Sequence, residues 1–422
     1  MNYDIIVVGG GAAGFFAAIN CAEKRPDLKI AILERGASCL EKVRISGGGR
    51  CNVTHGEFIP RPLTANYPRG EKELLGPFHR FMTGDTMAWF EERGVSLTIE
   101  EDGRVFPSSN TSESIITCFE EQARLYGVEV LVKQALKGLY KEEKWHVQTH
   151  ISQFTATKVI LATGSNPKIW KMLQELGHTY SKPVPSLFTF NCKDERIASL
   201  PGLSTPIQLE LLSDEGKPLK TSRGKRADRG GTSGALLITH WGFSGPAILK
   251  LSAWAARELQ AVNYQFKLKV NWVPDHDAQT IMAYLENLKH TNAKQQPGSG
   301  TYFNLPRRLW QQLLAATTIP AEKRWADLTR EELNQFAEIL TQSRFNINGK
   351  STFKEEFVTA GGINLKEVDF KTFASKKAEN LYFAGEILDI DAITGGFNFQ
   401  NAWTGAYLVA EAVAESILKS IN

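Results

Sequence analysis

Cysteine is scarce and unpaired in this sequence. Its 422 residues include five cysteines and no C-x-x-C pair. An odd number of scattered cysteines argues against a zinc site and a dithiol redox centre, and it indicates a reducing compartment. We therefore expect no metal. The five cysteines are Cys21, Cys39, Cys51, Cys118 and Cys192.

Long apolar runs are missing as well. No stretch reaches the roughly 18 consecutive apolar residues of a membrane span. The N-terminal MNYDIIVVGGG has no basic start, and its apolar run leads straight into glycines. We therefore expect a buried strand here rather than a signal peptide, no membrane partner, and a cytoplasmic location.

A strong charge of either sign is also absent. The chain carries 49 Lys and Arg residues against 46 Asp and Glu residues, which gives a net charge of +3 and an isoelectric point near 8.4. This balance neither proves nor excludes a nucleic-acid partner, because local clustering matters more than the total. The length of 422 residues favours two or three domains.

A glycine motif near the N-terminus predicts a dinucleotide site. Residues 3–8, YDIIVV, are typical of a buried parallel strand, and Gly9, Gly11 and Gly14 lead from it into a helical pattern. In a G-x-G-x-x-G turn the second glycine lets a pyrophosphate approach the backbone, and the third lets helix and strand pack closely. The helix N-terminus offers free N–H groups to the anion.

The acid after the next predicted strand narrows the choice of dinucleotide. Residues 28–33 form this strand, and Glu34 follows it, twenty residues after Gly14. A carboxylate here accepts hydrogen bonds from ribose hydroxyls and repels a 2′-phosphate. FAD or NAD is therefore favoured over NADP at this turn.

The rest of the chain supplies two further predicted strands and a second helix N-terminus. Residues 158–165, KVILATGS, and 381–386, LYFAGE, predict strands, and Gly395 and Gly396 stand directly before an alanine-rich helical pattern. Each piece alone is also compatible with a simple packing motif. NAD needs no second helix, whereas the ring of FAD gains negative charge on reduction, which a helix N-terminus stabilises. Together the pieces favour FAD.

A second glycine cluster raises the question of its purpose. Residues 44–55 read RISGGGRCNVTH, and the residues after the glycines are poor helix starters, so we expect no helix to follow. This stretch, with VVGGGAAG, GRVFPSS, LATGS, THWGFSGPA, TAGGI and GE…TGGFNFQNAW, resembles the BaiN/RdsA-type NAD(P)/FAD-dependent oxidoreductases of the glutathione-reductase-like flavoprotein class. The matching stretches span almost the whole chain in the expected order.

The resemblance implies that residues 46–52 lie against the flavin end of FAD, where a side chain on the glycines would fill the space of the ring. Arg50 would place a positive charge near phosphate or flavin, or else cap a surface turn. Cys51 is more simply a small buried residue than a redox thiol. The predicted FAD-binding residues are Gly9, Gly11, Ala12, Ala13, Gly14, Glu34, Arg35, Arg44, Ser46, Gly47, Gly48, Gly49, Arg50, Cys51, Asn52, Leu136, Ala162, Thr163, Gly164, Gly385, Glu386, Gly395, Gly396, Phe397, Asn398 and Gln400.

The predicted fold is α/β: an FAD-binding Rossmann-like (glutathione-reductase-type) domain with an inserted antiparallel β-barrel-like domain and a small helical domain. Alternating stretches such as IQLELLS, GALLITH and YQFKLKVNW indicate the antiparallel part, and DAQTIMAYLENLKH, LPRRLWQQLLAAT and TREELNQFAEILT indicate helices. TREE predicts a capping box. The predicted domains are 1–188 with 350–422 for FAD, 189–273 for the strands and 274–349 for the helices.

Two features of the insert bear on substrate. His240, in a polar and aromatic loop, is the candidate proton donor, although it could equally fix the loop structure. Residues 217–229, KPLKTSRGKRADR, carry six basic residues and one acid. They predict either a solvated hairpin tip or an arm that contacts phosphates.

We expect an FAD-dependent oxidoreductase that passes hydride through flavin N5. The resemblance implies reduction of a uridine in 23S ribosomal RNA to dihydrouridine, or else a small-molecule activity: reduction of a steroid-like enone or oxidation of an amine. NAD(P)H is a possible transient donor, although no second G-x-G-x-x-G marks a nicotinamide domain. A non-catalytic FAD-binding module is the remaining alternative, and the sequence leaves the oligomeric state open.

Overall fold

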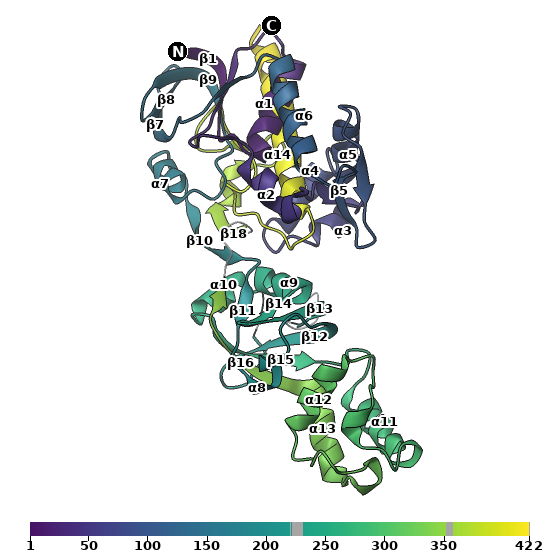
Figure 1. The fold of residues 1–422 in the computed structure, drawn as a ribbon. Helices are drawn as coiled ribbons and strands as arrows, with labels where there is room; N and C mark the ends of the chain where they lie inside the picture. The colour runs from purple at the N-terminus through teal and green to yellow at the C-terminus, as the bar shows by residue number, and fades with distance from the viewer. Residues whose placement is uncertain (220, 222–230, 352–357, 422) are drawn as a thin grey trace. The chain divides into compact units, whose positions relative to one another are not determined.

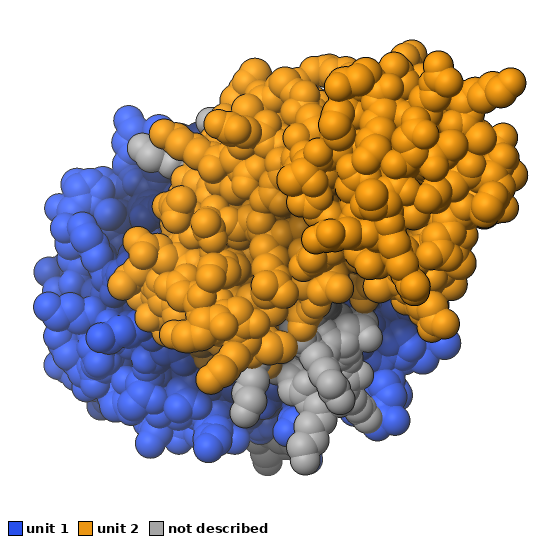
Figure 2. Space-filling view, turned by 90° about the horizontal axis from the view of Figure 1, so that it is seen from below, with its two compact units in different colours: residues 1–184, 354–422 blue, residues 185–353 orange. Residues whose placement is uncertain are grey.

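The computed structural model describes residues 1–219, 221, 231–351 and 358–421. The chain forms two compact units: unit 1 comprises Met1–Val184 and Lys354–Asn422, and unit 2 comprises Pro185–Phe353. Figure 2 colours unit 1 blue and unit 2 orange. The division into three domains expected from the sequence stays a prediction.

A parallel sheet forms the centre of unit 1 and confirms the predicted α/β fold. Its strands follow the order β6, β2, β1, β9, β21. The central strand β1 buries the side chains of Ile5, Ile6 and Val7 completely, as expected for a strand covered on both faces. The strands are β1 Asn2–Val8, β2 Ile30–Leu33, β6 Glu129–Leu131, β9 Gln153–Leu161 and β21 Leu381–Phe383.

Three helices lie together beside this sheet in Figure 1: α1 Ala12–Lys24, α6 Glu113–Leu125 and α14 Phe397–Ile421. α1 is buried along most of its length, which its Ala and Phe content permits. Aromatic rings fill the space around Phe16, with Trp89 at 4.5 Å and Trp403 at 5.2 Å between ring centroids. Helices α1 and α14 therefore begin near the same edge of the sheet, where β1 and β21 end.

No helix follows directly on the second glycine cluster, as the sequence predicts. Its glycines close α2, Glu41–Gly49, and the chain continues into the short strand β3, Thr54–His55. The remaining elements of unit 1 are α3 Pro60–Thr64, α4 Glu71–Phe78, α5 Thr83–Glu91, β4 Leu97–Ile99, β5 Arg104–Pro107, β7 Leu136–Lys141, β8 Trp145–Thr149, α7 Pro167–Glu175, β18 Val358–Ile363, η5 Leu365–Glu367, β19 Val368–Asp369 and β20 Ala374–Ser375. β10, Tyr180–Ser186, pairs with β18 and leads into unit 2.

Unit 2 contains the predicted antiparallel sheet. The strand order is β16, β15, β12, β13, β14, β11, β17, and among the described residues this pairing does not close into a barrel. The strands are β11 Thr189–Asn191, β12 Ser204–Leu212, β13 Gly231–Thr239, β14 Gly242–Ser244, β15 Gln265–Asn271, β16 Ser343–Asn348 and β17 Lys350–Ser351. Alternate residues of β12, β15 and β16 enter a core shared with the helices.

The three predicted helices of unit 2 are present as α11 Ala278–Thr291, α12 Arg307–Ala315 and α13 Arg330–Gln342. The Thr329 hydroxyl caps α13 and Glu332 completes the predicted capping box. β16 corrects the sequence analysis, which placed residues 343–348 in the helical part, because this strand extends the sheet beside β15. The other helices are α8 Glu195–Ala198, α9 Pro246–Trp254, α10 Ala256–Ala261, η3 Pro297–Ser299 and η4 Trp325–Asp327.

Most of the basic segment 217–229 lies outside the described residues, so its predicted contact with phosphates is not addressed by the structure. Within the described part of the chain, no helix is both long enough and apolar enough to cross a membrane.

Candidate cofactor-binding site

The turn between β1 and α1 has the packing that its glycines predict. A Cβ on Gly14 would overlap the carbonyl oxygen of Gly9, and a Cβ on Gly9 would overlap that of Ala162. Gly9 also has a φ of 114°, which disfavours other residues. In contrast, a Cβ on Gly11 would meet no atom within 4 Å. Two of the three glycines are thus needed for packing, and the third faces open space.

That open space lies at the N-terminus of α1. Gly11 is the N-cap residue and no side chain caps the helix, so the N–H groups of its first turn, around Ala12 and Ala13, have no side-chain acceptor from the cap. Free N–H groups and the helix dipole together attract an anion. The residues therefore fit the diphosphate of a dinucleotide.

The carboxylate of Glu34, which follows β2, forms hydrogen bonds with two backbone N–H groups. One carboxylate oxygen accepts the N–H of Gly10 at 2.8 Å and the other accepts the N–H of Gly36 at 2.7 Å. Each oxygen retains a second lone pair that a ribose hydroxyl can use. The carboxylate thus also supports the glycine turn, a role that the sequence analysis did not assign.

The segment before β7 runs beside Glu34. Gln134 donates its N–H to the carbonyl of Glu34 at 2.7 Å, and Lys133 donates to that of Gly36 at 2.8 Å. Leu136, two residues further on, is partly exposed, and Arg35 is exposed. The predicted contacts of these two side chains with the adenosine half stay predictions.

The residues after β9 supply a buried polar atom without a partner. Ala162 bonds to Val8 through its backbone N–H at 2.8 Å, which places Thr163 and Gly164 at the carboxyl edge of the sheet. The Thr163 hydroxyl is buried and has no hydrogen-bond partner in the described structure. Buried polar groups are normally satisfied, so this hydroxyl is suited to a bound ligand.

Glu386, after β21, approaches the same edge. Its carboxylate accepts a hydrogen bond from the Lys42 ammonium at 2.5 Å and another from the backbone N–H of Thr359 at 3.1 Å. Gly385 packs against the first turn of α1, since its Cβ would lie 3.1 Å from the Cβ of Ala13. The residues after β21 thus meet the first glycine turn.

The second glycine cluster has three consecutive left-handed residues. Gly47, Gly48 and Gly49 have φ values of 57°, 69° and 84°. A Cβ on Gly48 or Gly49 would meet no atom within 4 Å. The glycines are therefore required by the backbone conformation, and they leave room beside two of them, as a cofactor ring would need.

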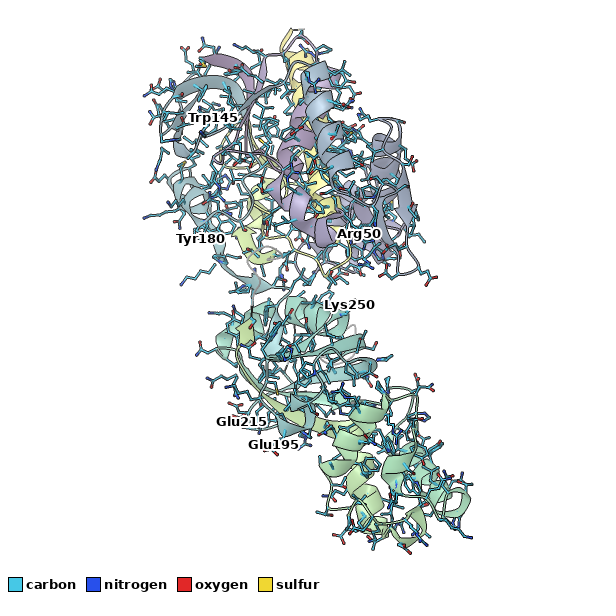
Figure 3. All side chains as sticks on the ribbon, viewed as in Figure 1. Arg50, Trp145, Tyr180, Glu195, Glu215 and Lys250 are labelled. Carbon is cyan, nitrogen blue, oxygen red and sulfur yellow. The ribbon has the colours of Figure 1, made fainter. Side chains whose placement is uncertain are left out.

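Arg50 is held by its neighbours within unit 1, and Figure 3 labels it there. Its guanidinium lies 3.8 Å from the ring centroid of Phe106 and bonds to Glu100 at 2.7 Å. Arg44 likewise forms an ion pair, with Glu113. A role of either arginine at the cofactor stays a prediction.

Cys51 is fully buried, with no exposed area. Burial raises the pKa of its thiol to about 12, although a hydrogen bond with Ser46 opposes this shift. A thiol with so high a pKa is neutral at physiological pH and a poor nucleophile. The geometry agrees with the interpretation of Cys51 as a packing residue.

Asn52 joins the second glycine cluster to the start of α14. With its amide oriented to satisfy its partners, the oxygen accepts the N–H of Gly396 at 3.0 Å and the nitrogen donates to the carbonyl of Thr54 at 3.0 Å. The Trp403 indole donates to the carbonyl of Val53 at 2.8 Å. The two glycine-rich segments, 344 residues apart, therefore form one structure.

Further contacts fix the first turn of α14. The Gln400 amide oxygen accepts the Thr54 hydroxyl at 2.5 Å. The His55 ring lies 4.4 Å from that of Phe397 and makes a 3.0 Å hydrogen bond to the carbonyl of Gly395. Asn398 bonds to both backbone groups of Ala392 through its side chain. The predicted residues Gly395, Gly396, Phe397, Asn398 and Gln400 thus act first as a scaffold for the helix N-terminus.

His240 belongs to unit 2 and is exposed. It lines a hollow of about 370 Å³ together with residues of the turn after β11, among them Cys192 and Asp194. His240 belongs to a different unit from the predicted FAD-binding residues, and its catalytic role stays a prediction.

Sequence reasoning missed three charged residues beside this site. Lys42 binds Glu386, and Arg69 pairs with Asp391, a few residues before α14. Only the position of Asp391, between the predicted strand and helix, gave a signal in the sequence. No motif or spacing in the sequence marks Lys42 or Arg69.

The assembled residues fit FAD. The open N-terminus of α1 suits a diphosphate. The Thr163 hydroxyl, which has no partner in the described structure, can form a hydrogen bond with a ligand. The space beside Gly48 and Gly49 suits a ring near a second helix N-terminus. Among the described residues, no group of His, Cys, Asp and Glu could hold a metal ion.

Known proteins support this interpretation. The HI0933-like protein Rossmann domain family matches residues 3–412. The chain is 26% identical to a ribosomal RNA dihydrouridine synthase of Haemophilus influenzae over 97% of this chain and 98% of that protein. It is also 26% identical to a 3-dehydro-bile acid delta(4,6)-reductase of Clostridium scindens, again over 97% and 98%.

A solved structure with a similar fold is the 3-ketosteroid-delta4-(5alpha)-dehydrogenase of Rhodococcus jostii RHA1, in complex with 4-androstene-3,17-dione. It has a TM-score of 0.51 and 12% identity, and the match covers 98% of this chain and 97% of that one. With the family match over almost the whole length, the chain belongs to the HI0933-like Rossmann family of FAD-dependent oxidoreductases.

Proposed function

We propose that this protein reduces a carbon–carbon double bond conjugated to a carbonyl group, and that its substrate is a uridine of 23S ribosomal RNA. The observation that carries the proposal is the bond between Asn52 and Gly396, which brings the second glycine cluster to the N-terminus of α14. When bound, FAD supplies a hydride from its N5 position.

The relatives support this reaction class. Formation of dihydrouridine saturates a double bond conjugated to a carbonyl of the uracil ring, and a delta(4,6)-reductase of a 3-dehydro bile acid acts on bonds conjugated to a ketone. Both relatives are equally similar to this chain at 26% identity. The choice of RNA rests on a second dihydrouridine synthase, from Escherichia coli, at 24% identity.

In this proposal the chain contributes binding and electrostatics. The N-terminus of α1 holds the diphosphate and Glu34 holds the ribose hydroxyls. The bare backbone at Gly48 and Gly49 admits the flavin ring, and the N-terminus of α14 stabilises negative charge that develops on it. NAD(P)H is the proposed hydride donor, and His240 the proposed proton donor to the substrate carbon.

The test uses the purified protein loaded with FAD under anaerobic conditions. Bleaching of the flavin by NADH or NADPH identifies the donor. The reduced protein is then mixed with 23S ribosomal RNA from cells that lack the modification, and digested nucleosides are analysed by mass. A uridine that gains two hydrogen atoms supports the proposal. Unmodified RNA, with a flavin that stays reduced, contradicts it.

A small conjugated enone is the second candidate substrate, favoured by the bile-acid relative. Reoxidation of the reduced flavin by a 3-keto steroid enone, but not by RNA, would favour it. Reduction of the flavin by an amine without NAD(P)H would indicate an oxidase. A flavin that no donor reduces would leave a non-catalytic FAD-binding module. Action on ribosomal RNA would also place the protein in the cytoplasm.

A further inference from the structure

Arg69 and Asp391 form a buried ion pair in unit 1. Arg69 Nε donates to Asp391 Oδ1 at 2.5 Å, and Nη2 donates to Oδ2. The Asp391 side chain is 0% exposed and that of Arg69 is 7% exposed. Because the loss of hydration offsets most of the attraction in such a pair, it contributes little net stability. Its presence therefore calls for another explanation.

The segment around Arg69 forms hydrogen bonds with the start of α14 and with the residues just before it. The Asn66 carbonyl accepts the N–H of Ile393 at 3.0 Å, and the Tyr67 hydroxyl donates to the carbonyl of Phe397 at 2.5 Å. The ion pair follows two residues later along the same segment. Residues 66–69 thus hold the chain both at the helix and just before it.

A second set of contacts places Asp391 close to the N-terminus of α14. Its neighbour Ala392 is bonded through both backbone groups to the Asn398 side chain, at 3.0 and 3.2 Å, and Asn398 is the second residue of α14. A negative charge here is attracted to the positive end of the helix dipole and lowers the positive potential that the helix N-terminus offers to a ligand. Arg69 cancels that charge at hydrogen-bonding distance.

We propose that Arg69 is a positioning residue that neutralises Asp391 and thereby keeps the N-terminus of α14 favourable to the negative charge of a reduced flavin. This inference rests on the proposed location of the flavin ring at that helix. The hydrogen bonds between Asp391 and Arg69 tie the segment before α14 to residues 66–69. The positive charge of Arg69 offsets the repulsion that the Asp391 carboxylate would exert on a reduced flavin. The other buried carboxylate nearby, Asp389, is held by the Ser181 hydroxyl at 2.7 Å.

The inference predicts opposite effects from the two halves of the pair. Arg69→Met removes the positive charge that is paired with Asp391, so the midpoint potential of bound FAD should fall. Asp391→Asn leaves a bare guanidinium, so the potential should rise. A tenfold change in the ratio of reduced to oxidised FAD, about 30 mV for a two-electron couple, is the expected scale. Arg69→Met combined with Asp391→Asn should return the potential toward the wild-type value.

The potentials are measured on the FAD-loaded full chain by anaerobic titration against a reference dye. Arg93→Met is the matched control, because Arg93 is also a poorly exposed arginine in an ion pair, with Glu23 at the far end of α1. It should lower stability without moving the potential. Arg69→Lys, which keeps the charge, should hold the potential near the wild-type value.

Shifts of the same sign in Arg69→Met and Asp391→Asn would overturn the inference, as would shifts no larger than that of Arg93→Met. Loss of FAD from Arg69→Met and Arg69→Lys alike would also overturn it, because a purely structural role would then suffice. If the predicted shifts occur but ribosomal RNA is not reduced, only the proposed substrate fails. A wild-type chain that binds no FAD would remove both proposals.

Discussion

Lys42 and Glu386 are joined by an ion pair of 2.5 Å that links the helix of the second glycine cluster to the end of β21. The Lys42 side chain is 61% exposed, whereas that of Glu386 is 20% exposed. An ammonium held in this position lies between the two segments proposed to bind FAD. An ion pair with a largely exposed partner contributes little to the free energy of unfolding. The charge of Lys42 should therefore affect the binding of the ligand rather than the stability of the fold.

We expect Lys42→Met to weaken FAD binding several-fold while changing the free energy of unfolding by less than about 1 kcal/mol, as for other exposed ion pairs. FAD affinity is measured by fluorescence titration of the apoprotein, and stability by urea unfolding. Lys168→Met, at an exposed lysine of α7, is the control and should change neither. Unchanged affinity in Lys42→Met would place Lys42 outside the binding site.

The glycines of the first turn should separate packing from binding. Gly14→Ala places a methyl group on the carbonyl oxygen of Gly9, so it should destabilise the fold by about 1–3 kcal/mol through overpacking. Gly11→Ala meets no atom within 4 Å and should leave the fold intact. Its methyl group would occupy the proposed diphosphate space, so FAD affinity should fall. Equal FAD affinity in Gly11→Ala and wild type would contradict this placement.

Glu34 is expected to contribute to both the turn and the ribose. Glu34→Ala should weaken FAD binding by about 1.5–3 kcal/mol, the range for hydrogen bonds to a charged group. Because the same carboxylate accepts the N–H groups of Gly10 and Gly36, the apoprotein should also lose stability. Calorimetric titration with FAD measures the first effect and thermal unfolding the second. Full FAD occupancy after purification together with unchanged affinity would show that Glu34 does not bind the ribose.

Cys51 should be inert to thiol reagents in the folded protein, because burial raises the pKa of its thiol to about 12. The measurement is a colorimetric thiol titration at neutral pH of wild type and Cys51→Ser. We expect the same number of reactive thiols in the two folded proteins, and one more in denatured wild type than in the denatured variant. A faster reaction of folded wild type would point to a reactive Cys51 after all.

His178 should make unit 1 sensitive to acid. Burial lowers the pKa of its imidazole below 6.5, and Ser375 and Glu367 lie 2.8 and 3.0 Å from its two ring nitrogens. The unfolded chain then binds the proton more readily, so stability is lost as pH falls from 6.5 toward the folded value. Although burial opposes it, hydrogen bonds from Thr179 and His178 lower the pKa of Glu367 below 4.5, which adds a second loss below that pH.

Thermal unfolding between neutral pH and pH values below 4.5 tests this expectation. His178→Gln cannot titrate, so its stability should vary less with pH in the upper window, even if its absolute stability is lower. The slope is therefore the diagnostic quantity. Identical slopes in variant and wild type would mean that another group causes the acid sensitivity.

The sequence by itself determined the elements with a local signal. Hydrophobic period and glycine spacing mark the strand predicted over residues 3–8, the turn from Gly9 to Gly14 and the helix after Gly396. The capping box at Thr329 is equally local. Such signals involve neighbours within a few residues, so they can be seen before any tertiary contact is known.

Only the tertiary structure decided which residues meet. The bond of Asn52 to Gly396 and the ion pair of Arg69 with Asp391 each join residues more than 300 positions apart. No period or spacing marks such partners, because they are brought together by the order of strands in the sheet and the packing of α14 on α1. Strand β16 was missed for a related reason: its six residues follow directly on a helix and take their conformation from pairing with β15.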